Sequence, residues 1–408
     1  MIKIAVLVPE GFFTTPERFG GGIVRAYKIY FEQLSKMPFF EICFYSYNST
    51  NKTLYFTDMM EALVKFNKYK PDVILTPCEV EISMLLAIIL GIIARRPVVI
   101  IFNAIPLTGH VGSGLSLDEK KAFKYIIQSC IGSNDLKNIF LCGAKSVTKF
   151  LLVLVLMYTA RFLRRQIIAI AVTPHIGREL QRRKLKVVDI YPGNGIDVPQ
   201  RMLNSTKIYD SCYIANPIHI EKGLLDVLYI WRIVTRENPM AKLIIAGKIA
   251  KDLSENKLRG YIQRLYLGEN IDLRISYETI SRGEILNIMS RCKVFIYPSR
   301  KDTWGLIMGE AMSIGLPAIA YALPGIEYAY SWCQGIKLVK VGDIITFSRE
   351  TTSLLKNNEL LSYMSNIALK CARKMSWRKV ALLEIKAILK ALRQYYLGKT
   401  KFNTNTDY

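Results

Sequence analysis

The feature that most constrains this chain is the stretch 293–321, KVFIYPSRKDTWGLIMGEAMSIGLPAIAY. Residues 293–297 are mostly β-branched or aromatic and are followed by Pro298, which indicates a short strand that ends there. Gly315 marks the expected end of a helix, and a second apolar run, 318–321, follows it. Two strands joined by one helix through such short connections form a right-handed βαβ unit. The sequence therefore predicts a parallel sheet with the first loop at its ligand-binding edge.

One carboxylate in this stretch has no charged neighbour in sequence. Glu310 is the only charged side chain between Asp302 and Glu327, and Leu306 and Ile314, one turn away on either side, are apolar. An isolated carboxylate on such a helix must be paired, protonated or bound to something, since burying it alone is prohibitive. We expect it to bind a ligand; the alternative is a salt bridge to an Arg or Lys from elsewhere in the chain.

The same stretch resembles the signature of the large retaining GT-B glycosyltransferase family (group 1, family 4-like). The family pattern is P-S-x-x-acid-x-aromatic-G-L-x-x-x-E-A-M-x-x-G-x-P. The matching positions here are Pro298, Ser299, Asp302, Trp304, Gly305, Leu306, Glu310, Ala311, Met312, Gly315 and Pro317. The chain departs from the family at Asp302, where a glutamate is usual, so this carboxylate has a shorter reach.

The resemblance implies roles for these residues. Glu310 would accept hydrogen bonds from the ribose hydroxyls of a nucleotide sugar. Asp302 and the backbone N–H groups that follow it would hold the sugar. The expected nucleotide-sugar-binding residues of this loop are Thr303, Trp304, Gly305, Leu306 and Glu310.

A second motif, Glu221-Lys222-Gly223, opens a helix after the run ANPIHI. It matches the family's E-K-G, whose lysine meets the donor diphosphate, and a cation at a helix N-terminus is well placed for phosphate. The family usually has an arginine about six residues earlier, whereas this chain has Asn216 or, with a shifted gap, Pro217. Arg300 or Lys301 could replace that missing cation.

Near the start, the apolar run MIKIAVLV is followed, after a loop, by Gly20, Gly21 and Gly22 and then by a helical run, 23–34. Glycines let backbone N–H groups approach an anion, and a helix N-terminus adds partial positive charge. The sequence allows either a phosphate cradle or a flexible turn, and the resemblance favours the cradle.

The expected strand 98–102 ends at Asn103, where related enzymes often carry a histidine beside the reacting sugar. Asn103 can donate and accept hydrogen bonds but cannot transfer protons. His110 is the nearest alternative, although a loop histidine without a role explains it as well.

Strands and helices are expected to alternate throughout, which predicts an α/β protein with two Rossmann-like, doubly wound parallel-sheet domains facing a cleft, as the GT-B resemblance implies. Residues 1–192 would form the acceptor domain and 193–375 the nucleotide-sugar-binding domain, with a turn-rich hinge at 194–197. The helix 377–397 would pack back on the first domain. Expected strands include 39–45, 72–76, 98–102, 167–172, 187–191, 211–215, 242–246 and 271–275.

Composition limits the partners. The formal charge of +23 is compatible with binding to nucleic acid, to an anionic membrane or to anionic small molecules. The 51% of apolar residues exclude a disordered chain.

The eight cysteines show no paired metal-ligand spacing, and Met1 leads directly into a strand, so we expect a reducing cytoplasm. No Asp-x-Asp pair is present in the expected cleft loops, and the family needs no obligatory metal, so we expect none and no cofactor besides the donor substrate.

Two runs are more apolar than a soluble enzyme needs: 84–94 and 150–158. Both are too short to span a bilayer. The second is bracketed by cations: Lys145, Lys149, Arg161, Arg164, Arg165, Arg178, Arg182, Arg183, Lys184 and Lys186. This pattern favours a helix lying in an anionic membrane interface, with a buried helix beside a solvated basic face as the alternative.

The sequence therefore predicts a retaining hexosyltransferase that moves a sugar from a nucleoside diphosphate sugar to a sugar or lipid-linked acceptor at the inner face of the membrane. A GT-B epimerase or phosphorylase is one alternative, although the three histidines provide few groups for epimerase chemistry. A non-catalytic sugar-, membrane- or nucleic-acid-binding protein is another, but no nucleic-acid-binding motif is present.

Overall fold

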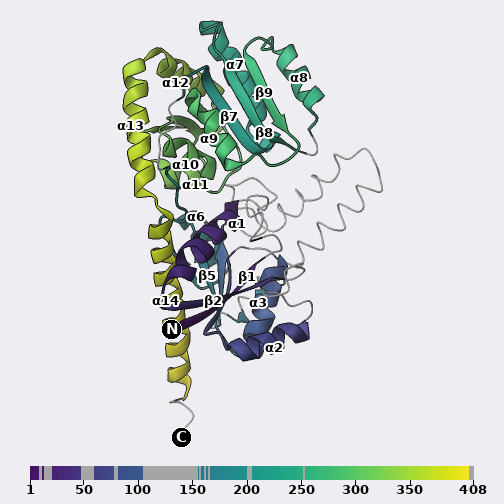
Figure 1. Ribbon diagram of the computed structural model, residues 1–408, viewed down its shortest axis with the longest axis vertical. Helices are drawn as coiled ribbons and strands as arrows, with labels where there is room; N and C mark the ends of the chain where they lie inside the picture. Colours follow the sequence, from purple (N-terminus) through teal and green to yellow (C-terminus); the bar gives the residue numbers. More distant parts are fainter. Residues whose placement is uncertain are drawn as a thin grey trace, which may run out of the picture. The chain divides into compact units, whose positions relative to one another are not determined.

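The computed structural model describes residues 1–8, 12, 21–46, 59–77, 81–103, 155, 158–159, 162–163, 166–199, 205–250 and 253–403 (Figure 1). These divide into two compact units. The first contains the described residues up to Gly195 and those from Trp377 onward, and the second contains 196–376. Each unit is built on its own six-stranded sheet.

The first sheet has the order β2-β1-β3-β4-β5-β6, and all its neighbouring strands are parallel. Its strands are β1 (Ile2–Val8), β2 (Phe40–Ser46), β3 (Val73–Thr76), β4 (Val98–Phe102), β5 (Ile167–Ala171) and β6 (Val187–Asp189). β3, β4 and β5 are buried along their whole length, which is why the sequence reads there as continuous apolar runs rather than alternating ones.

The elements that connect these strands are mainly helical. They are α1 (Gly21–Ala26), η2 (Tyr27–Gln33), η3 (Leu34–Lys36), α2 (Met59–Tyr69), α3 (Glu81–Ala94) and α6 (Pro174–Arg182). The single helix expected over 23–34 is thus a short α-helix that continues as a π-helical segment.

The long C-terminal helix α14 (Trp377–Asn403) packs against the first unit through a buried polar cluster. Arg25 and Glu384 form an ion pair in which both side chains are fully buried. The Tyr30 hydroxyl also donates to Glu384, and Arg25 Nε donates to the Gly193 carbonyl at 2.6 Å. Three segments distant in sequence, around residues 25–30, 193 and 384, therefore meet at one carboxylate and one guanidinium.

The second sheet is also parallel, with the order β12-β11-β10-β7-β8-β9. Its strands are β7 (Tyr209–Ile218), β8 (Leu243–Ile249), β9 (Ile271–Ser276), β10 (Cys292–Tyr297), β11 (Ala318–Tyr321) and β12 (Ile336–Val339). Its helices are η4 (Ile220–Lys222), α7 (Leu224–Glu237), α8 (Glu255–Arg264), α9 (Arg282–Ser290), α10 (Leu306–Ser313), α11 (Pro324–Tyr330), α12 (Ile344–Lys356) and α13 (Asn358–Lys374).

This sheet has a core on each face. Along β7, Cys212 and Ile214 contribute to a core with α9, α10, α11 and α13, whereas Tyr213 and Ala215 contribute to a second core with α7, α8 and α12. The alternation follows from the two-residue period of a strand. Helices on both faces make the unit doubly wound.

The predicted βαβ unit is confirmed. β10 and β11 are adjacent and parallel, with Phe295 opposite Ala318, and α10 connects them. The loop 298–305 thus lies at the carboxyl edge of the sheet. Gly305, at the start of α10, has φ +70°, a conformation that glycine adopts without strain.

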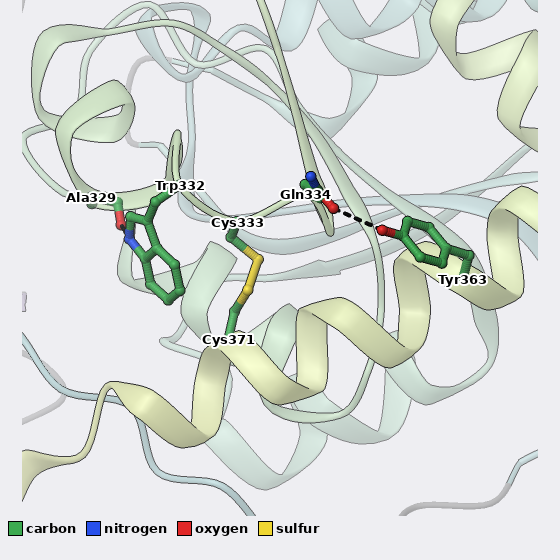
Figure 2. The surroundings of a disulfide bond; sticks show 6 residues. All are labelled: Ala329, Trp332, Cys333, Gln334, Tyr363 and Cys371. Atoms are coloured by element: carbon green, nitrogen blue, oxygen red, sulfur yellow. Dashed lines mark hydrogen bonds between the residues drawn. A yellow bond between two sulfur atoms is a disulfide. The ribbon is translucent and has the colours of Figure 1, made fainter.

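A disulfide joins Cys333, just after α11, to Cys371 on α13 (Figure 2). Both residues are buried within the core on the α13 face. The sequence, which favours a reducing cytoplasm, does not predict this disulfide. Sequence spacing could not show it, because 38 residues separate the two cysteines and only the packing of α13 brings them together.

Among the described residues, no helix is long and apolar enough to cross a membrane. The apolar run 84–94 is most of α3, whose Met84 and Leu90 are buried while Ile92 and Ile93 are exposed. Most of 150–158 lies outside the described residues, as do Arg161, Arg164 and Arg165. Val155 and Tyr158 are described, and both are exposed.

Candidate functional site

The centre of the candidate site is the Asp302 carboxylate, which four donors contact within the second unit. Oδ1 accepts from the backbone N–H groups of Trp304 (3.0 Å) and Gly305 (2.7 Å). Oδ2 accepts from the Tyr297 hydroxyl (2.6 Å) and from Lys222 Nζ (2.9 Å). The structure thus brings together Lys222 and Asp302, two of the predicted site residues, from loops 80 residues apart.

These contacts decide the charge of Asp302. Burial acts to raise the pKa of its carboxyl group, but the Lys222 ammonium and the hydrogen bonds from Tyr297, Lys222 and Trp304 outweigh it and lower that pKa to about 2. Burial, and after it the same carboxylate, raises the pKa of the Tyr297 phenol, which therefore stays a donor. At neutral pH the site holds a paired ammonium and carboxylate.

A close backbone approach places Lys222. Gly223 has φ +82°, and a Cβ added there would lie 1.8 Å from the Pro298 carbonyl oxygen. Only glycine lets the turn η4 rest on the end of β10 in this way. Lys222 Nζ can then donate to the Lys301 carbonyl at 2.9 Å as well as to Asp302.

The loop after Asp302 contributes mainly backbone. The Trp304 indole is buried and packs edge-on against Tyr330, and Leu306 packs against the same core. A Cβ at Gly325 would lie 1.9 Å from the Thr303 carbonyl oxygen, so the start of α11 packs directly on this loop. The loop is consequently fixed in place, and the backbone N–H groups of Trp304 and Gly305 both point at the carboxylate.

Glu310 on α10 is in an ion pair. Its Oε1 lies 3.3 Å from Nε of Arg282. Nη1 of the same arginine lies 3.5 Å from a carboxylate oxygen of Asp197. Arg282 further donates to the Asp197 carbonyl at 2.7 Å. The salt-bridge alternative is therefore realised, but the Glu310 side chain stays 24% exposed, so a ligand can still reach it.

The cations expected to replace the missing arginine are already engaged by acids. Arg300 makes two hydrogen bonds to Asp226, at 2.8 and 3.0 Å, and Lys301 lies 3.1 Å from Glu221. Asn216, at the exposed end of β7, accepts from Lys248 N at 2.8 Å through its side-chain oxygen. Lys222 is also paired with an acid, but its partner Asp302 belongs to the loop itself, so Lys222 lies directly against the loop.

In the first unit, two more predicted residues meet. A Cβ added at Gly22, in the first turn of α1, would lie 3.1 Å from Asn103 Nδ2, so this glycine packs tightly on the end of β4. The same Nδ2 donates to the Pro77 carbonyl at 3.2 Å, at the end of β3. Gly21 begins α1, whereas Gly20 and His110 lie outside the described residues.

Sequence reasoning missed two groups that build the site: Tyr297, which it treated as a strand residue, and Arg282, which belongs to no motif that the sequence analysis singled out. The signal for Tyr297 was its position as the last residue of a strand that ends at the ligand-binding edge. Within the described part of the chain, no cluster of His, Cys, Asp and Glu could hold a metal ion.

Residues 212–370, which include the Lys222–Asp302 pair and Glu310, match the family described as glycosyl transferases group 1. This match covers most of the second unit. A curated relative, the GDP-mannose:cellobiosyl-diphosphopolyprenol alpha-mannosyltransferase of Xanthomonas oryzae, is 30% identical over 150 residues, or 36% of each chain. Trehalose synthase of Pyrococcus horikoshii is 30% identical over 111 residues, or 26% of each. These matches span about a third of the relatives' length or less.

Solved structures extend the likeness to both units. Sucrose-phosphate synthase from Thermosynechococcus elongatus aligns with a TM-score of 0.66 at 13% identity, covering 96% of this chain and 99% of the other. HepE of Anabaena, in complex with UDP and glucose, aligns with a TM-score of 0.66 at 14% identity, covering 96% and 100%. The predicted GT-B glycosyltransferase fold, with two parallel-sheet α/β domains, is confirmed.

Proposed function

We propose that this protein is a retaining glycosyltransferase that moves a hexose from a nucleoside diphosphate sugar to an acceptor. The observation that carries the proposal is the Lys222–Asp302 pair at the carboxyl edge of the second sheet, inside the region that matches the group 1 glycosyl transferases. An ammonium held at this edge is suited to a diphosphate, because its position is fixed before the ligand arrives.

In this proposal Lys222 stabilises the negative charge that develops on the departing diphosphate. Asp302, kept ionised by its donors, orients Lys222 and fixes the loop 302–305 against which the sugar lies. Glu310 accepts hydrogen bonds from the ribose hydroxyls. Arg282 would share Glu310 with the ligand, since both partners of that ion pair are partly exposed.

The first unit would hold the acceptor, with Gly22 and Asn103 near the reacting groups. We propose a lipid-linked or otherwise membrane-borne acceptor. A relative named for cellobiosyl-diphosphopolyprenol supports this assignment, as do the exposed Val155 and Tyr158 beside the cationic stretch 161–186. In that case the protein works at the inner face of the membrane as a peripheral enzyme.

The test is a binding screen of the purified protein against UDP-, GDP- and ADP-sugars by isothermal titration calorimetry. The proposal predicts saturable binding of one nucleotide class and competition by the matching nucleoside diphosphate. Failure of all three classes to bind would overturn it.

A further inference from the structure

The C-terminal helix α14 presents a second, exposed face that the proposed chemistry does not use. The side of the helix that packs against the first unit is made of buried residues spaced three or four apart: Val380, Ala381, Glu384, Ala387, Ile388, Ala391, Leu392 and Tyr395. The opposite side carries large apolar residues that a solvated helix does not need.

These apolar residues recur every two turns. Leu382 is 47% exposed, Leu389 41% and Tyr396 41%, and Leu397 beside them is 55% exposed. Residues seven apart differ by about 20° around an α-helix, so Leu382, Leu389 and Tyr396 form one narrow strip of about 40°.

Cations line the same face. The exposed basic residues of this helix between 378 and 397 are Arg378, Lys379, Lys386, Lys390 and Arg393. The single acid in that span is Glu384, which is buried in the ion pair with Arg25. At 100° per residue, Lys379, Lys386, Lys390 and Arg393 occupy the roughly 60° of arc beside the apolar strip. The exposed face, the α14 face, is therefore apolar along one edge and basic along the other.

Beside the C-terminal half of α14 lies the end of α3. The Tyr395 hydroxyl donates to the Arg95 carbonyl at 2.8 Å, just after α3 ends. Ile92 and Ile93 in the last turn of α3 are 47% and 52% exposed. The first unit thus exposes further apolar side chains in the segment that contacts the C-terminal half of α14.

We infer that the α14 face docks the protein on an anionic lipid bilayer. A bilayer interface accepts both edges of the face: leucine and tyrosine enter the acyl boundary, while lysine stems extend their ammonium groups to lipid phosphates. A buried protein interface would instead have to desolvate five cations, and a nucleic acid would leave the leucine strip uncovered. The span 378–397 is about 30 Å long, enough for every cation to meet a separate headgroup.

This inference rests on the proposed function only for the purpose of lipid binding, which is to hold the enzyme near a membrane-borne acceptor. Lipid binding itself needs no donor and no catalysis, so it can be tested separately. Titration of the same protein samples with a nucleoside diphosphate measures binding at the donor site. Loss of lipid binding and loss of nucleotide binding can therefore be told apart.

The experiment is flotation of the full chain with vesicles of neutral phosphatidylcholine or of phosphatidylcholine with 30% phosphatidylglycerol. One variant carries Lys386→Glu, Lys390→Glu and Arg393→Glu, and another Leu382→Ser and Leu389→Ser. A matched control carries Lys257→Glu, Arg264→Glu and Lys370→Glu, three exposed cations of the second unit, and has the same net charge as the first variant. Circular dichroism and nucleotide titration check that each variant is folded.

We expect the wild type and the control to float with anionic vesicles, less so at high salt. The charge variant should lose at least about 100-fold in partitioning, since each of the three lost cations contributes roughly fivefold and each new glutamate is repelled by the anionic lipid. The leucine variant should bind the anionic vesicles more weakly than the wild type, and its remaining binding should still fall at high salt. Either of two results would overturn the inference. In the first, the α14 variants float like the wild type, while a variant with Arg161→Glu, Arg164→Glu and Arg165→Glu does not float. In the second, the wild type binds an RNA oligonucleotide but no vesicle.

Discussion

At the scale of single residues, the candidate site consists of charged side chains whose positions are fixed by ion pairs and hydrogen bonds with one another. The sequence predicted that Lys222, Asp302 and Glu310 would be functional, because their motifs are local. It could not predict that Lys222 donates to Asp302 or that Arg282 pairs with Glu310, because these partners lie far apart in the chain and meet only when parallel strands align their ends.

The first prediction concerns Lys222. Lys222→Ala removes the cation beside the loop, and a charge-assisted phosphate contact contributes about 1.5 to 3 kcal/mol, so nucleoside diphosphate affinity should fall roughly 10- to 100-fold. Calorimetry measures this. Lys301→Ala is the matched control, since Lys301 is a neighbouring lysine that faces Glu221 instead. Equal affinities for the wild type and Lys222→Ala would rule out the diphosphate role.

Glu310 provides the second prediction. Glu310→Ala should reduce activity by orders of magnitude and leave the fold intact, and Glu310→Gln should be milder because the amide still accepts a hydrogen bond. Turnover and thermal melting are measured together. Arg282→Ala serves as the control, since it breaks the ion pair without removing the acceptor. If both Glu310 variants melt well below the wild type yet keep donor affinity, Glu310 is purely structural.

At the scale of elements, the periodicity of the sequence was a good guide wherever burial was strong. The strands 98–102 and 318–321 have the predicted bounds, because each is a continuous apolar run with turn formers at its ends. β7 runs over Tyr209–Ile218, longer than expected, and β12 was not predicted. Both contain polar residues, such as Asn216 and Lys337, that interrupt the apolar pattern by which a strand is predicted.

The buried pair of Arg25 and Glu384 provides a third prediction, at this scale. Glu384→Ala leaves a fully buried guanidinium without its carboxylate and should cost about 3 to 5 kcal/mol of unfolding free energy in the first unit. Replacing both, as Arg25→Met with Glu384→Leu, should recover most of that loss. Urea unfolding measures both effects. A single variant as stable as the wild type would mean that the pair does not hold α1 to α14.

At the scale of the whole molecule, the two parallel-sheet α/β units could be predicted because strands and helices alternate through the chain. The GT-B resemblance covers most of the second unit and, through fewer residues, the first. The disulfide could not be predicted, because it depends on how α13 packs against the turn after α11. The sequence does not identify the acceptor either, because the residues that contact an acceptor have no local sequence signature.

The fourth prediction is that turnover needs no divalent metal. Lys222 and backbone N–H groups would supply the charge stabilisation that a metal provides elsewhere. Activity should therefore be the same in EDTA and in added magnesium or manganese. A complete, reversible loss of activity on chelation would contradict this mechanism.

The most direct test of the central claim is a proton NMR time course of the matching nucleotide sugar with the wild type, Lys222→Ala and Lys301→Ala. The account predicts that the wild type and Lys301→Ala consume the donor and give a product with the donor's anomeric configuration, while Lys222→Ala is slower by at least the roughly 10-fold loss in phosphate binding. Consumption at the same rate by all three proteins, or a product of inverted configuration, would contradict it.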